Sequence, residues 1–316
     1  MSVKLSWWVT LAPEDGRVRP AEERFYAGAF SSHYHPDPYR VFAGPEGEQA
    51  FGPGDIPVLG DSTVASTGLC ERLGELASPA GGGRFLNFGI TAANSGVSLA
   101  RILHDIVDAR PRAIVVLGGG SDILMPMSFD PRPGYPHVQL VYDLLFEGRF
   151  DPRTRSLWLK GEQPDGPALR QLFFDRLAAL RRETGYGTPA WEAAIVARFV
   201  GNVEKMARIC SAWAVPLLFV MQPVGVLKRV RSRHEAMMLP PPESEAYIAR
   251  QYEAARDALS DSSVWTEGET AFLDLSDLFL NEEAEIFRDV IHPGERGMDL
   301  VARKIAARLR SAGWLG

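Results

Sequence analysis

The sequence predicts an α/β fold with three layers, in which helices cover both faces of a central parallel sheet of five strands. Three observations lead to this prediction. From residue 55 onward, short strand-like runs alternate with amphipathic helical patterns, which is typical of βαβ units. Each strand-like run ends in a polar or glycine-rich turn. The composition, with 46% hydrophobic and 23% charged residues, is that of a globular chain with a packed core.

Five runs rich in β-branched and other apolar residues are expected to be the strands. They comprise residues 55–60, 84–89, 113–118, 215–221 and 271–275. For these strands we expect a flavodoxin-like parallel sheet with the strand order 2-1-3-4-5.

Helical periodicity fills the intervals between these runs. The expected helices comprise residues 95–110, 189–212, 243–259 and 295–312. The first has an inward face formed by Val97, Leu99, Ile102, Leu103 and Ile106. The last has an inward face formed by Leu300, Val301, Ile305 and Leu309.

Two regions do not fit this repeat. Residues 1–54 are rich in Pro, Gly and aromatic residues, and we expect an N-terminal extension packed on the main domain, which comprises residues 55–316. Residues 123–188 are an insertion after the third strand. Since ligands bind beyond the carboxyl ends of the strands in open parallel sheets, this insertion is expected to cap the site.

The charge and the cysteines exclude several classes of protein. A net charge of −6, with basic residues mixed among acidic ones, argues against a nucleic-acid partner. The densest basic run, residues 229–234, is expected to be a solvated loop or helix face. Cys70 and Cys210 are too few for a disulfide framework or a cysteine-based zinc site, and we expect both to be buried thiols.

Hydropathy and the histidines set further expectations. No apolar run approaches the length of a membrane span, and the N-terminal stretch is a poor signal peptide, so we expect a cytoplasmic protein. His33 and His35 have a spacing that could bind a metal ion on a strand, but no third ligand is evident near them, and a surface loop is favoured. Neither a metal nor a cofactor is expected, and the oligomeric state stays open.

Small and polar residues follow the predicted strands. Ser62 follows the first strand, Gly89 ends the second, the run 118–122 follows the third, and Asp289 and His292 follow the fifth. Because the carboxyl ends of parallel strands meet at one edge of the sheet, we expect these residues to lie close together.

A serine, a histidine and an aspartate at one edge are the groups that acyl transfer requires. Ser62 needs a base to become a nucleophile, and the base, His292, needs a carboxylate that fixes its tautomer and stabilises its charged form. Asp289 is three residues from His292, so a tight loop can turn both side chains to the same side. Taken singly, Ser62 or Asp289 could equally be a helix cap, and the glycines could be turn formers.

Four segments, in this order and at this spacing, resemble the sequence blocks of the SGNH or GDSL hydrolases. They are Gly60-Asp61-Ser62, the glycine of Asn87-Phe88-Gly89, Gly119-Gly120-Ser121-Asp122, and Asp289-Val290-Ile291-His292. The resemblance covers roughly residues 55–312 and implies the SGNH hydrolase fold. It also implies that Ser62 is the nucleophile, that His292 and Asp289 complete the catalytic triad, and that the oxyanion hole is formed by Ser62, Gly89 and the third-block residue.

The third block departs from the family pattern, because Ser121 stands where the family has Asn. A hydroxyl is shorter than a carboxamide and has one hydrogen to donate. Three interpretations stay open: Ser121 donates to the oxyanion directly or through water, another group takes its place, or the protein has lost efficient hydrolysis. The candidates for a replacement are Asn94 and the backbone N–H groups of Gly119 and Gly120, and the further candidates for the pocket are Asp61, Asn94, Gly120 and Gln222.

The resemblance implies a serine esterase that cleaves an acyl ester of a carbohydrate, lipid or small metabolite, so the expected partner is a small-molecule or glycan acyl ester. One alternative is an acyltransferase with the same triad, in which an alcohol or amine captures the acyl-enzyme because the pocket excludes water. Another is a catalytically weakened binding module that kept the fold.

Overall fold

The central sheet has the predicted topology. The computed structural model describes residues 35–37, 41–43, 51–77, 83–136, 139–146 and 167–315. Its five-stranded sheet is parallel, with the order β4-β3-β5-β6-β7. The strands are β3 (Ile56–Gly60), β4 (Phe85–Gly89), β5 (Ile114–Gly118), β6 (Leu217–Met221) and β7 (Thr270–Asp274). The prediction of the order 2-1-3-4-5 is therefore confirmed, and each strand lies within two residues of its expected bounds.

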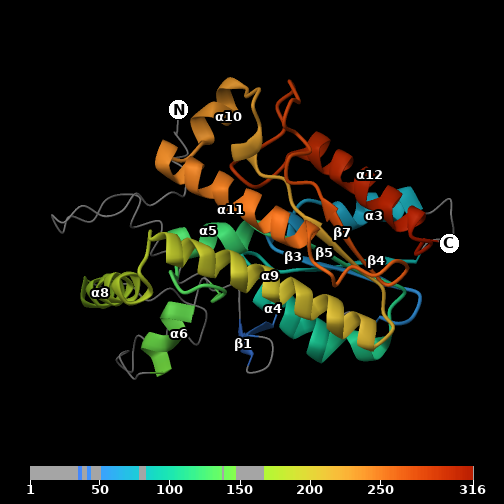
Figure 1. The fold of residues 1–316 in the computed structure, drawn as a ribbon, viewed down its shortest axis with the longest axis horizontal. Coiled ribbons are helices and arrows are strands. Elements are labelled where there is room, and N and C mark those ends of the chain that lie inside the picture. The colour runs from blue at the N-terminus through green and yellow to red at the C-terminus, as the bar shows by residue number, and fades with distance from the viewer. Residues whose placement is uncertain are drawn as a thin grey trace.

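Helices cover both faces of this sheet, as the sequence predicts (Figure 1). One face packs against α4 (Ser95–Arg101), α9 (Pro189–Ala212) and α11 (Pro242–Ser260). The opposite face packs against α3 (Leu69–Ala77) and α12 (Glu295–Ser311). Because both faces are covered, β3 and β6 are buried along their whole length, which explains their unbroken apolar sequence.

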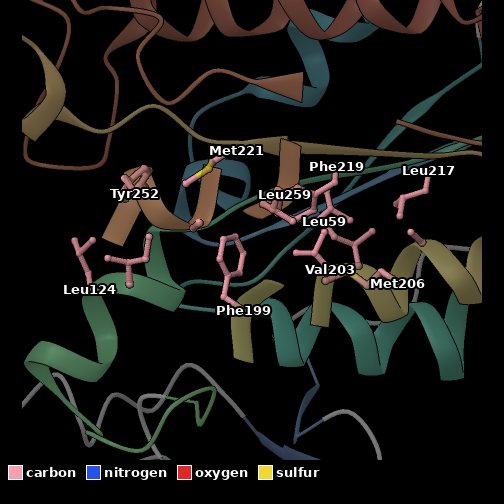
Figure 2. Close-up of a cluster of buried hydrophobic side chains, with 14 of the residues drawn as sticks. Leu59, Leu124, Phe199, Val203, Met206, Leu217, Phe219, Met221, Tyr252 and Leu259 are labelled. Atoms are coloured by element: carbon pink, nitrogen blue, oxygen red, sulfur yellow. The ribbon is translucent and has the colours of Figure 1, made fainter. Parts of the chain in front are cut away.

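The core between the sheet and α9 is shown in Figure 2. Leu59 and Phe219 project from the strands toward Phe199, Val203 and Met206 of α9, and all five side chains are buried. The ring centroids of Phe199 and Phe219 lie 5.9 Å apart. This packing fixes the sheet whose carboxyl ends carry the polar residues described below.

The helix predicted at 95–110 is not continuous, and one of its expected core residues is wrong. Helix α4 ends at Arg101, a π-helical turn follows over Ile102–Ile106, and a 3₁₀ turn follows over Val107–Ala109. A π turn adds a residue to the helical turn and rotates the following side chains around the axis. Leu103 is therefore 42% exposed instead of facing the core.

The structure describes only parts of the extension and of the insertion. Within residues 1–54, β1 (His35–Asp37) pairs antiparallel with β2 (Val41–Ala43), whereas His33 and the side chain of His35 lie outside the described residues. Phe51 packs edge to face on Phe88, with ring centroids 5.4 Å apart.

The insertion includes α5 (Gly120–Ser128), α6 (Gln139–Phe146) and α8 (Pro167–Thr184), and residues 147–166 lie outside the described part. Figure 1 shows α8 at the left end of the view and α6 at the lower left, whereas α5 lies nearer the middle, beside α9 and α11. That the insertion caps a site stays a prediction.

Cys70 and Cys210 are buried free thiols, as predicted. Burial raises the pKa of each to about 12, so neither thiol is ionised near neutral pH. Among the described segments, no helix combines the length and hydropathy of a membrane span.

Candidate active site

The carboxyl ends of the strands meet at one edge of the sheet. Gly60 at the end of β3 pairs with Gly89 of β4 on one side and with Leu117 of β5 on the other. Gly118, which ends β5, pairs with Met221, which ends β6. The turns that follow β3, β4, β5 and β6 are therefore neighbours, and they carry most of the residues singled out in the sequence.

Ser62 is held by a tight turn between β3 and the short helix α2 (Ser62–Ala65). Asp61 is the N-cap of this helix, and its Oδ1 accepts the Thr63 N–H at 2.8 Å. Gly60 is required because a Cβ there would lie 2.4 Å from the Leu117 carbonyl oxygen. The turn places Ser62, half-buried, directly beyond β3, which lies between β4 and β5 in the sheet.

Ser62, His292 and Asp289 form a continuous row of hydrogen bonds. Ser62 Oγ lies 2.6 Å from His292 Nε2, and His292 Nδ1 lies 2.7 Å from Asp289 Oδ2. Because an ionised carboxylate can only accept, we assign the ring hydrogen of neutral His292 to Nδ1. The Nε2 atom is then the acceptor for the Ser62 hydroxyl, which is the arrangement needed to remove a proton from serine.

The loop that carries His292 is fixed by backbone donors. Asp289 Oδ1 accepts the N–H groups of Ile291 and His292, both at 2.9 Å. The tip of the loop is held by the segment after β6, because the Gly225 N–H donates to the Val290 carbonyl oxygen at 2.7 Å. Each oxygen of Asp289 therefore has a separate task, one shaping the loop and the other orienting the imidazole.

These contacts shift the pKa values of both partners toward the ion pair. Burial alone would raise the pKa of Asp289, but the hydrogen bond from His292 and the two backbone N–H groups outweigh it and hold the pKa below its ordinary value. Burial alone would lower the pKa of His292, but the hydrogen bond and the charge of Asp289 raise it above its ordinary value. Asp289 therefore favours a proton on His292.

Two of the expected oxyanion donors give their hydrogens to other groups. The Gly89 N–H donates to Asn87 Oδ1 at 2.9 Å, and Ser121 Oγ donates to Asp61 Oδ2 at 2.9 Å. Each donor has a single hydrogen, so neither is available to an oxyanion in this structure. The structure thus gives both donors other acceptors, and their role in an oxyanion hole stays a prediction.

Asn94, a predicted pocket residue, is likewise used within the fold. Its Oδ1 accepts the Val97 N–H at 3.2 Å as the N-cap of α4, and its Nδ2 donates to the Gly134 carbonyl oxygen at 3.1 Å. The side chain is buried. Asn94 therefore joins α4 to the insertion, and its role as a replacement for the third-block donor stays a prediction.

Ala92 is a candidate that the sequence did not reveal. It lies in the turn after β4 with φ at +58°, a conformation uncommon for a residue with a Cβ. Within the described residues, the N–H groups of Ala92 and Ser62 have no acceptor. The same turn donates the Ile90 N–H to the Gly60 carbonyl oxygen at 2.9 Å, beside the start of α2. Glycine would have signalled such a turn in the sequence, whereas alanine does not.

Gly120 and Gln222, also predicted for the pocket, lie next to each other just after the carboxyl ends of β5 and β6. Gln222 is fully buried, and neither polar atom of its carboxamide has a partner in the described part of the chain. A Cβ on Gly120 would lie 2.2 Å from Gln222 Nε2 and 3.5 Å from Asp61 Oδ2. Gly120 therefore leaves the space that the Gln222 carboxamide occupies.

A buried polar network, also not foreseen, supports the start of α5. Asp122 accepts the Ser95 hydroxyl at 2.5 Å and the Ser95 N–H at 3.0 Å, and Asn202 donates to the Ser95 hydroxyl at 3.0 Å. Burial raises the pKa of Asp122 to about 6, and the nearby charge of Asp61 adds to this effect. The network ties α5 to α4 and α9.

Known structures resemble this one in fold. No protein-family model matches the chain, and no curated protein matches its sequence. An acetylxylan esterase from Geobacillus stearothermophilus is 13% identical, with a TM-score of 0.46 over 84% of this chain and 98% of that chain. An alpha/beta hydrolase enzyme from the metagenome of Lake Arreo, Spain, is 12% identical, with a TM-score of 0.47 and coverage of 84% and 98%. Identities this low do not transfer a substrate, so the function is inferred below from this chain's own residues.

Proposed function

We propose that the protein is a serine ester hydrolase that cleaves an acyl ester of a carbohydrate, lipid or small metabolite through an acyl-enzyme on Ser62. The observation that carries the proposal is the hydrogen-bonded row from Ser62 Oγ to His292 Nε2 at 2.6 Å and from His292 Nδ1 to Asp289 Oδ2 at 2.7 Å. A serine, a base and an orienting carboxylate in this order are what nucleophilic acyl transfer requires.

The reaction would proceed in two halves. Ser62 Oγ attacks the acyl carbon while His292 Nε2 takes its proton, and Asp289 stabilises the resulting imidazolium. His292 then protonates the departing alcohol oxygen, which leaves the acyl group on Ser62. In the second half, His292 takes a proton from water, the hydroxide attacks the acyl carbon, and Ser62 leaves with the proton returned from His292.

The developing oxyanion needs donors that are not already engaged. The N–H groups of Ser62 and Ala92 meet this condition, since both lie at the carboxyl edge of the sheet without an acceptor in the described residues. Donors held by the backbone need no rearrangement when charge develops on the oxygen. We assign the oxyanion hole to these two groups in place of Gly89 and Ser121.

Solvent exposure favours hydrolysis over acyl transfer. The side chain of His292 is 26% exposed and that of Asp289 is 28% exposed, so water can approach the base. Transfer to an alcohol or amine requires a pocket from which water is excluded.

The test compares wild type with Ser62→Ala on chromogenic esters from acetyl to decanoyl and on an acetylated sugar. Loss of the nucleophile is expected to lower kcat/KM by about 10⁴-fold or more. Ser66→Ala is the matched control, because Ser66 is exposed at the end of α2 and donates to the Ser62 carbonyl oxygen. A folded Ser62→Ala protein that keeps a substantial part of the wild-type rate would contradict the proposal.

The same assay separates hydrolysis from transfer. Adding an acceptor alcohol at increasing concentration is expected to leave the free acid as the main product. Quantitative conversion to the new ester in dilute acceptor would instead indicate an acyltransferase.

A further inference from the structure

A buried ion pair lies next to the loop that carries the base. Lys228 Nζ lies 2.6 Å from Glu235 Oε2, and the two side chains are 1% and 5% exposed. Lys228 follows the 3₁₀ turn after β6 (Gly225–Leu227), and Glu235 is in the first turn of α10 (Arg233–Met238). Burying two opposite charges costs desolvation energy, and apolar residues of similar volume often hold a fold as well. A contribution to the stability of the fold is therefore not a sufficient explanation for the burial of Lys228 and Glu235.

Glu235 uses both oxygens to hold backbone. Its Oε1 accepts the N–H groups of Ile286 and Phe287 at 2.9 and 3.1 Å. Its Oε2 accepts Lys228 Nζ at 2.6 Å and the Ser232 N–H at 2.8 Å, so the carboxylate joins the start of α10 to residues 286 and 287. The Ser232 hydroxyl completes the capping box by accepting the Glu235 N–H.

Lys228 also binds the backbone just before residues 286 and 287. Besides Glu235, its ammonium donates to the Ala284 carbonyl oxygen at 2.7 Å. Both members of the pair thus bind the backbone between residues 284 and 287, which immediately precedes Asp289.

This segment is the base of the triad loop. Phe287 forms an isolated antiparallel bridge with Pro293, the Arg288 N–H donates to the His292 carbonyl oxygen at 2.9 Å, and the Gly294 N–H donates to the Ile286 carbonyl oxygen at 2.6 Å. A displacement of residues 286 and 287 would therefore be transmitted to Asp289 and His292 through the strands of this narrow loop.

We propose that Glu235, held as a buried carboxylate by Lys228, is a positioning residue that sets the distance between His292 and Ser62. The inference rests on the proposed function, because it concerns the alignment of the proposed base. Burial alone would raise the pKa of Glu235, but Lys228 and three backbone N–H groups lower it to about 2, so the carboxylate keeps its charge at the pH values of an esterase assay. Glu235 touches neither substrate nor the reacting atoms.

The test uses Glu235→Gln, which keeps the shape of the side chain. A carboxamide can still accept the Ile286 and Phe287 N–H groups with its oxygen, but its amino group then faces Lys228 Nζ and the Ser232 N–H, which are both donors. We expect kcat to fall about 10- to 100-fold with KM changed less than about threefold, because a displacement of the base by a fraction of an ångström slows proton transfer more than it weakens binding. Hydrogen exchange is expected to accelerate in the peptide spanning residues 284–292.

Three further variants serve as a control for an unrelated ion pair and as a test of the Lys228 charge. Glu192→Gln breaks the ion pair with Arg250, formed at 2.8 Å between α9 and α11, and is expected to leave kcat unchanged. Lys228→Arg keeps a cation and is expected to retain more of the wild-type kcat than Lys228→Met, which keeps the apolar stem alone.

The outcomes distinguish this inference from the proposed function. Wild-type protein without Ser62-dependent esterase activity would overturn both. Wild-type activity together with a Glu235→Gln protein of unchanged kcat and unchanged exchange in residues 284–292 would overturn the positioning role alone. An activity loss that merely follows the folded fraction, measured by circular dichroism and equal in Glu235→Gln and Lys228→Met, would assign the pair a structural role and also overturn it.

Discussion

Ser62 and His292 share one hydrogen bond but are supported in different ways. Ser62 follows β3, which lies between β4 and β5 and is buried at every residue. The turn that carries Ser62 is fixed by Gly60 and Asp61. His292 lies on a loop whose only regular pairing in the described structure is the Phe287–Pro293 bridge. That loop is held by side-chain carboxylates that accept backbone N–H groups. The proposed nucleophile thus follows a fully buried strand, whereas the proposed base lies on a loop whose backbone is held largely by polar contacts.

This difference predicts that substitutions near Ser62 mainly affect stability, whereas substitutions near His292 mainly affect catalysis. Changes at the Ser62 turn should disturb the packed sheet and lower stability, because interiors are close-packed and resist added volume. Changes in the polar contacts of the base loop should lower catalysis while leaving the sheet intact, because the buried apolar side chains of the loop, Ile286, Phe287, Val290 and Ile291, stay in place.

The largest effect is expected for Asp289→Asn. The amide can still accept the Ile291 and His292 N–H groups through its oxygen, but its amino group would face His292 Nδ1 and favour the wrong tautomer. We expect kcat to fall by about 10⁴-fold with little change in the thermal midpoint. Steady-state kinetics and calorimetry on Asp289→Asn and on the exposed control Asp277→Asn check this, and a variant as active as the control would refute the assigned role of Asp289.

The opposite behaviour is expected for Gly60→Ala at the nucleophile turn. The new Cβ would lie 2.4 Å from the Leu117 carbonyl oxygen and 2.5 Å from Val64 Cγ2, so β3, β5 or α2 must shift. We expect a loss of about 1–3 kcal/mol in the free energy of unfolding. Gly74→Ala is the matched control, because a Cβ there meets nothing within 4 Å in α3 and an alanine favours a helix by about 0.5–1 kcal/mol. Denaturant unfolding of both variants gives the comparison, and equal stability would show that the turn is not tightly packed.

The smallest effect concerns pH. His292 must be neutral to accept a proton, and its pKa is raised, so kcat/KM is expected to fall on the acid side below a pKa higher than the ordinary value of 6.5. Burial and Asp289 have the larger effects on this pKa, and the charge of exposed Arg288 lowers it slightly. Arg288→Gln should therefore move the acid limb to higher pH without changing the plateau.

The shift from Arg288→Gln should shrink in high salt, because exposed charges are screened. An acid limb of the kcat/KM profile that moves to lower pH in Arg288→Gln would contradict the expectation that Arg288 lowers the pKa of His292. In wild type, an acid limb with an apparent pKa below the ordinary histidine value would indicate that another group carries the essential proton.

Much of the fold could be predicted because its signals are local. Strands β3, β5 and β6 are uninterrupted apolar runs. Helix α9 begins at Pro189 after a Thr188 cap, and each residue is in a position that it favours. The π turn after Arg101 gave no such signal, because the apolar spacing of residues 95–110 fits a regular helix equally well.

The site was predicted only in part, for a physical reason. Ser62, Asp289 and His292 could be singled out because their residue types and order along the chain are distinctive, and the structure brings their side chains together. Which hydrogens stay free depends on contacts between distant segments, such as Ser121 with Asp61, and these have no local signature. The contact of Glu235 with residues 286 and 287 likewise joins segments that are far apart in the sequence.

The central claim is that Ser62 is a nucleophile activated by His292, and covalent trapping tests it most directly. Wild-type protein is treated with a fluorophosphonate, and the site of modification is identified by mass spectrometry of the intact chain and of its peptides. The account predicts one phosphonyl group per chain, located on Ser62, with a reaction rate that falls sharply in His292→Ala. A folded wild-type chain that is not labelled, or is labelled on another residue, would contradict it.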